Sequence, residues 1–127
     1  MLTVGYEKSL GQISGRIDGE LNEEVARHYF TQVAEVIKAT QCHRVLTDVR
    51  FAKLNARESE MEALSAELIT MGIVVGSRRA ILVNEDIKQY KTWENYCFRN
   101  GYKNIRLFID EQAANEWLLS DSDLILN

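Results

Sequence analysis

The sequence contains no proline, and its 127 residues include only two cysteines and two histidines. Without proline, the turns must depend on Gly, Asn and Asp. Cys42 and Cys97 lack the C-x-x-C spacing of a redox or metal motif, so we expect small buried thiols in a reducing compartment. These cysteines and the scattered His28 and His43 do not supply the paired ligands of a structural zinc site. The sequence therefore predicts no metal.

Other classes of protein are excluded by further absences. No apolar run approaches the roughly 20 residues of a membrane span, and the first residues lack the plan of a signal peptide. The formal net charge is -4, whereas nucleic-acid binding requires a clustered basic face. Gly72 and Gly76 do not form a glycine-rich phosphate loop, so we expect no nucleotide or other cofactor. We predict a cytoplasmic protein without nucleic-acid partners.

Strand-like and helix-like segments alternate along the chain. Short strands are expected at residues 2–6, 12–17, 43–49, 79–83 and 104–109, the first two forming a hairpin. Apolar residues at helical spacing predict helices that begin near Leu21, Asn55, Asn84 and Asp110. The order β-β-α-β-α-β-α-β-α predicts an α/β fold: four helices on a five-stranded, mostly parallel sheet with one antiparallel strand from the hairpin.

Individual residues predict where these helices begin and end. Asn22 or Asp18 can cap the first helix, and Asp110 can cap the last. Asn55 and Glu58 have the spacing of a capping box, which places the start of the second helix there. Gly72 should end this second helix. One domain is therefore expected over residues 1–119. The apolar tail over 120–127 would fold back on it or pack in a homodimer.

Four segments carry a family resemblance: residues 13–18, 45–48, 76–83 and 108–118. They cover strands leading into helices, a strand that closes on Asp48, and the last strand and helix. The chain resembles the STAS domain, and more closely its SpoIIAA-like relatives with a CRAL-TRIO-like architecture. The resemblance implies a non-enzymatic regulatory or protein-interaction module.

The resemblance also implies a phosphorylation switch, but the residues depart from it. STAS-type anti-sigma-factor antagonists carry a phosphorylatable Ser or Thr at the start of the helix that follows the third strand. Asn55 and Ala56 occupy this neighbourhood and cannot accept phosphate, and Ser59 lies one turn further on. Some SpoIIAA-like proteins are thought to bind lipophilic ligands or associate with membranes, which does not require the Ser.

Asp48 is the best polar candidate for a site, with Arg50 and Asn55 nearby. It ends a predicted parallel strand, where open α/β sheets place their ligand crevices. The alternative is that Asp48 binds a loop amide or pairs with Arg50. An enzyme would have to use this pair and a Tyr or Asn from another strand end. A Cys42–His43 dyad is disfavoured because neighbours on a strand point to opposite faces, and we predict that the protein is not an enzyme.

Two further groups are candidates for contacts with a partner. Ser77, Arg78 and Arg79 should lie at the sheet edge opposite Asp48, either as an anion or headgroup contact or as a solvated edge. In the third helix Tyr90, Trp93 and Cys97 share a face typical of a core. Tyr96 and Phe98 cannot both share it, so some aromatic area should mark an interface or a lid.

The sequence leaves two leading functions open. The first is a regulatory module with an unknown protein partner, acting through its helix-covered surface. The second is a carrier of a small lipophilic ligand, because methionines and aromatics make adaptable apolar walls. This ligand would lie between helices that carry Met61, Leu64, Met71, Tyr90 and Trp93.

Overall fold

A central sheet organises the computed structural model, which describes residues 1–84 and 87–120. The strands are β1 (Leu2–Glu7), β2 (Gln12–Ile17), β3 (Gly19–Leu21), β4 (Arg44–Asp48), β5 (Ala52–Leu54), β6 (Arg78–Leu82) and β7 (Ile105–Phe108). The helices are α1 (Glu23–Thr40), α2 (Glu58–Met71), α3 (Ile87–Arg99) and α4 (Glu111–Leu119). Five strands form the main sheet in the order β1-β2-β4-β6-β7. Only β1 is antiparallel to its neighbour, so the predicted α/β fold is confirmed.

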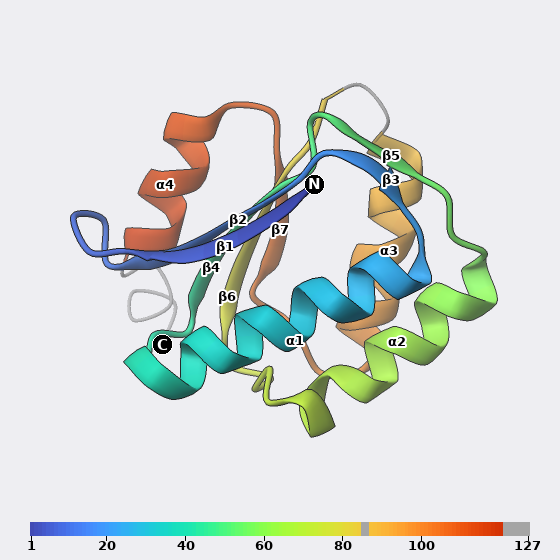
Figure 1. Ribbon diagram of the computed structural model, residues 1–127, viewed down its shortest axis with the longest axis horizontal. Coiled ribbons are helices and arrows are strands. Elements are labelled where there is room, and N and C mark those ends of the chain that lie inside the picture. Colours follow the sequence, from blue (N-terminus) through green and yellow to red (C-terminus); the bar gives the residue numbers. More distant parts are fainter. Residues whose placement is uncertain (85–86, 121–127) are drawn as a thin grey trace.

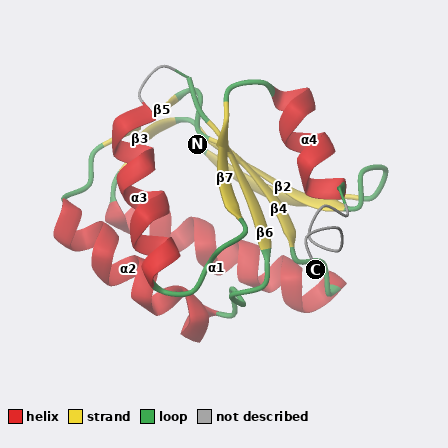
Figure 2. Cartoon of the chain, turned by 180° about the vertical axis from the view of Figure 1, so that it is seen from behind, coloured by secondary structure: helices red, strands yellow, loops and turns green. Residues whose placement is uncertain are grey.

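The helices cover the two faces of the sheet unequally. Helices α1, α2 and α3 lie on one face, and α4 lies alone on the other (Figures 1 and 2). Side chains of β6 alternate between these faces: Ile81 belongs to the large core under α1–α3, whereas Ala80 and Leu82 belong to a small core with Ala114 and Leu118 of α4. Two cores therefore share one sheet.

Helix ends follow the predicted chemistry in three places. The Asn22 side chain accepts a hydrogen bond from the Val25 amide (2.9 Å), and Asp110 does the same for Ala113 (3.0 Å). Gly72 ends α2 with a φ of 107°, a left-handed conformation that favours glycine. Each of these contacts satisfies backbone groups that the helix leaves unpaired.

The predicted start of α2 at Asn55 is wrong, because the helix begins only at Glu58. The Asn55 amide donates to the Leu21 carbonyl (2.9 Å), and its side chain donates to Glu20 (3.1 Å). These bonds hold the chain extended beside β3, and β3 and β5 form a two-stranded parallel ribbon that we did not predict. Leu21, expected to begin the first helix, ends β3 instead.

Two further predictions concern the C-terminal tail and membrane-spanning helices. The apolar part of the tail, residues 121–127, lies outside the described residues. Among residues 1–84 and 87–120, no helix is both long and apolar enough to cross a bilayer.

Candidate functional site

The C-terminal ends of β4, β6 and β7 lie together at the top of Figure 1 and form the C-terminal edge of the sheet. Asp48 is the last residue of β4, and Arg50, two residues later, pairs with it. The Arg50 amide donates to Asp48 Oδ1 (3.0 Å), and its guanidinium donates to both oxygens (Nε to Oδ1 3.1 Å, Nη2 to Oδ2 2.9 Å). Arg50 Nη2 also reaches Glu111 of α4 (3.2 Å). Burial alone would raise the pKa of Asp48, but the hydrogen bonds from Arg50 lower it below its ordinary value. Asp48 thus both binds a loop amide and pairs with Arg50.

Phe51 is the exposed aromatic at this edge, and our sequence analysis missed it. Its side chain is 60% exposed, with the Arg16 guanidinium carbon 4.8 Å and that of Arg50 5.9 Å from the ring centroid. Asp18 holds Arg16 from the other side (2.8 Å). Ile109, which is 66% exposed, directly follows β7 and lies two residues before Glu111. The sequence did contain a signal for Phe51, because this aromatic residue directly follows the Asp-x-Arg segment over residues 48–50 at the end of a predicted strand.

Neither of the two histidines lies at this edge. His28 is exposed on α1, and His43 precedes β4 at the opposite edge, so neither provides a base for Asp48. Across residues 1–84 and 87–120, no group of three His, Cys, Asp or Glu side chains could hold a metal ion. The chemistry available here is ionic and apolar contact.

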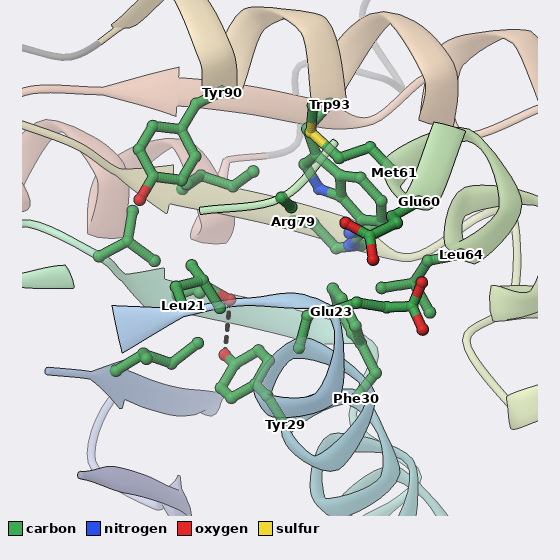
Figure 3. Close-up of a pocket in the computed structure, with 16 residues that line it drawn as sticks. Leu21, Glu23, Tyr29, Phe30, Glu60, Met61, Leu64, Arg79, Tyr90 and Trp93 are labelled. Atoms are coloured by element: carbon green, nitrogen blue, oxygen red, sulfur yellow. Dashed lines mark hydrogen bonds between the residues drawn. The ribbon is translucent and has the colours of Figure 1, made fainter. Parts of the chain in front are cut away.

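A cavity of about 70 Å³ lies between the sheet and helices α1, α2 and α3 (Figure 3). Its walls are largely apolar and include Ala26, Tyr29, Phe30, Met61, Leu64, Ile81, Tyr90 and Trp93. The Tyr29 hydroxyl and Thr47 share a hydrogen bond of 2.5 Å, and burial raises the pKa of Tyr29 to about 12. The predicted residues Met61, Leu64, Tyr90 and Trp93 border this cavity, whereas Met71 does not.

Arg79 is the buried cation of this cavity. Its side chain is surrounded by aromatic rings, with the guanidinium carbon 5.4 Å from the Phe30 centroid, 6.0 Å from Trp93 and 5.3 Å from Tyr102. Its Nη1 donates to Cys97 Sγ (3.8 Å). No ion pair among the described residues includes Arg79. The sequence reasoning treated this arginine only as part of a basic edge.

The expectation of a solvated edge at Arg78 and Arg79 is wrong, because these side chains are 8% and 5% exposed. Arg78 points to the other face, where Nη2 donates to the Trp117 carbonyl (2.9 Å) and to Ser120 Oγ (3.1 Å). Its guanidinium carbon lies 4.4 Å from the Trp117 ring centroid. Buried Ser77 donates to the Val74 carbonyl (2.6 Å) in the loop before β6.

The remaining candidates lie apart from one another. Trp93 borders the cavity and stacks on Phe30 at a centroid distance of 5.7 Å. Tyr96 donates its hydroxyl to Glu58 (2.9 Å) on the outer side of α2 and α3, and Phe98 is 52% exposed. The structure therefore brings Asp48 and Arg50 together, but it does not gather the predicted residues into one site.

Comparison with known proteins identifies the fold. No family model and no curated protein sequence matches this chain. An uncharacterized DUF3478-family protein with a SpoIIAA-like fold from Shewanella loihica PV-4 is 18% identical, with a TM-score of 0.60 over 92% of this chain and 93% of that one. The anti-sigma factor antagonist SpoIIAA in its unphosphorylated form is 12% identical (TM-score 0.58, 90% and 94% covered). The phosphorylated Bacillus cell fate determinant SpoIIAA is also 12% identical (TM-score 0.57, 91% and 98% covered). The arrangement of sheet and helices in this chain is therefore the SpoIIAA-like, STAS-type fold.

Proposed function

We propose that this protein is a non-enzymatic regulatory module that binds a protein partner through the C-terminal edge of its sheet. The observation that carries the proposal is Phe51, an exposed aromatic ring close to both the Arg16 and the Arg50 guanidinium groups. The fold supports the same reading, since one solved structure with this fold is an anti-sigma factor antagonist. We also expect a cytoplasmic location.

The physical basis is preorganisation. Exposed aromatic and arginine side chains contribute more binding free energy than most residues when a partner covers them. Asp48 and Glu111 already fix Arg50, and Asp18 fixes Arg16, so little side-chain freedom remains to be lost on binding. Ile109 adds apolar area at the same edge. The partner surface should therefore offer an apolar pocket with polar groups at its rim.

Photo-crosslinking tests this surface with a matched control. A photoreactive phenylalanine analogue replaces Phe51 in one protein and Phe98, a similarly exposed aromatic on α3, in the other. Both proteins are expressed in the cells that naturally produce the chain. We expect one protein to crosslink at position 51 and not at 98. Its purified form should bind the natural chain and Phe98→Ser equally, and Phe51→Ser at least about tenfold more weakly.

Three outcomes would contradict this proposal. Equal crosslinking at both positions would show nonspecific proximity. Crosslinking at 51 only to a second copy of the chain would make the edge a homodimer interface instead. Unchanged affinity in Phe51→Ser would remove Phe51 from the binding surface.

The cavity supports a second candidate function, a carrier of a small lipophilic ligand. Its walls come from three helices and the sheet, and they are largely apolar. Native mass spectrometry of freshly purified protein, compared with the denatured mass, should then reveal additional non-covalent mass. A bare mass after gentle purification would count against a tightly held ligand.

A further inference from the structure

We propose that the cavity binds a small organic monocarboxylate, whose carboxylate contacts the Arg79 guanidinium and whose apolar body lies against Phe30 and Trp93. The inference rests on the carrier function proposed above and specifies its ligand. Arg79, Phe30 and Trp93 all border the cavity (Figure 3).

The cavity contains the positive charge of Arg79. A buried guanidinium is normally paired with an acid, yet no ion pair of the described residues includes Arg79. Burial raises the pKa of its neighbour Cys97, so this thiol stays neutral and supplies no counter-charge. Aromatic faces stabilise the cation only in part. An anionic ligand would complete the pairing.

Two glutamates also line the cavity, but each has a partner of its own. Glu23 accepts a hydrogen bond from Arg27 Nε (3.3 Å) on α1. Glu60 accepts one from the Arg57 amide (2.8 Å) at the start of α2. Neither carboxylate is paired with Arg79, so the cation remains available inside the cavity.

The charge of the ligand head group follows from Arg79, the one cation among the described residues that line the cavity. One guanidinium balances one negative charge and offers two parallel N–H donors that match a carboxylate. A phosphate monoester carries about -1.5 to -2 charges and would leave excess negative charge in an apolar site. An ammonium group would be repelled by Arg79.

The body of the ligand follows from the size of the cavity. Its volume of about 70 Å³ is smaller than the roughly 150 Å³ of an engineered apolar cavity that binds benzene. A short aliphatic chain fits this space better than a sterol or a two-chain lipid. Hexanoate is larger than this volume, so its carboxylate and first carbons would lie inside the open cavity and the end of its chain would extend toward the opening, which makes it a suitable probe.

The two tryptophans allow binding to be observed directly. Trp93 borders the cavity, whereas Trp117 lies on the other face of the sheet against Arg78. In a Trp117→Phe protein, the fluorescence therefore reports on the cavity alone. A Trp93→Phe protein should show no ligand response and serves as the optical control.

The experiment titrates the Trp117→Phe protein with hexanoate, hexanol, hexylamine and hexyl phosphate. We expect hexanoate to bind at least about tenfold more tightly than hexanol and hexylamine to bind more weakly than either. Arg79→Met should reduce hexanoate affinity to that of hexanol and leave hexanol affinity unchanged. Arg44→Met, which changes an exposed arginine on β4, should alter neither.

The outcomes distinguish the carboxylate specificity of the cavity from the more general carrier function. Equal affinities for hexanoate and hexanol would overturn the carboxylate inference but leave an apolar carrier standing. The absence of any binding would overturn both. Tighter binding of hexyl phosphate would overturn the choice of a monoanion. If Arg79→Met does not fold, the ligand series on the protein with Arg79 intact decides the question.

Discussion

Arg78 and Arg79 are neighbours on one strand and are almost equally buried, yet they face opposite sides of the sheet and have different partners. On the α4 side, Arg78 donates to the Trp117 carbonyl and to Ser120, near the end of that helix. Under α1–α3, Arg79 has aromatic rings and a neutral thiol beside a cavity. The first arginine stabilises the fold, whereas the second leaves a charge that the described residues do not neutralise.

The comparison shows that burial alone does not reveal the role of a charged residue. A buried cation with hydrogen-bond acceptors contributes to stability, and its removal leaves those acceptors without a donor. A buried cation without a counter-charge contributes little or even destabilises, because its desolvation is not recovered. Such a residue is better explained by binding than by folding.

The largest expected effect comes from exchanging each arginine for methionine. Arg78→Met removes charge-assisted hydrogen bonds and leaves the Trp117 carbonyl without this donor, so we expect a loss of about 3 kcal/mol in the free energy of unfolding. Arg79→Met replaces a cation that has no ion-pair partner among the described residues with an apolar side chain of similar length, and we expect a change below about 1 kcal/mol. Urea denaturation of both variants measures the difference.

Equal destabilisation by the two exchanges would contradict the difference between the two arginines. It would mean that the aromatic contacts of Arg79 stabilise the protein as much as the hydrogen bonds of Arg78 do. The slope of the transition with urea should stay constant in both variants, since a changed slope would indicate an altered unfolded state.

A smaller effect is expected where the backbone of β2 meets α1. A Cβ atom added to Gly15 would lie 2.3 Å from the Tyr29 hydroxyl oxygen, a clash that requires the ring to move. Gly15→Ala should therefore cost about 2 kcal/mol. Gly5→Ala on β1 meets no atom within 4 Å and is the matched control, with an expected change within about 0.5 kcal/mol.

Thermal unfolding of the two glycine variants sharpens the contrast between the faces. A cost near zero for Gly15→Ala would show that Tyr29 swings into the neighbouring cavity without strain. This face would then be more deformable than its close contacts indicate.

The smallest effect concerns Arg50, which pairs with the carboxylate of Asp48. Because the pKa of Asp48 is lowered in the folded protein, the pair stabilises it above about pH 4, the ordinary pKa of an aspartate. This stabilisation is lost as the pH falls through the folded-state pKa. Solvent screening should limit it to below about 1 kcal/mol.

Unfolding measured from pH 7 to pH 2 should show the difference between the natural protein and Asp48→Asn shrinking as the pH falls. Glu111→Gln should flatten the curve less, since Glu111 makes only one contact with Arg50 and is more exposed. A difference that grows at low pH would mean that the Asp48 pKa is raised instead.

Local sequence patterns predicted much of the fold. Asn22, Gly72 and Asp110 determine helix ends through contacts with their own neighbours, so spacing alone locates them. Asn55 was misplaced because its partners, Glu20 and Leu21, lie far away in the sequence. Strands β3 and β5 have three residues each, too few for a periodic pattern.

The site could be predicted only in part for the same reason. Asp48 and Arg50 are two residues apart, and their pairing was one of the alternatives we considered. The environment of Arg79 depends on Phe30, Trp93 and Tyr102, which come from three separate segments. The only local sign of burial was that Arg79 begins the strand predicted over residues 79–83, which the structure places at Arg78–Leu82.

Helix α4 has a consequence for the order of events during synthesis. It covers Leu46, Ala80 and Leu82, which belong to strands made much earlier. Domains generally fold from the N-terminus onward as they are translated. Until α4 leaves the ribosome, one side of a nearly complete sheet stays exposed, as a transient binding surface for chaperones and other nascent chains.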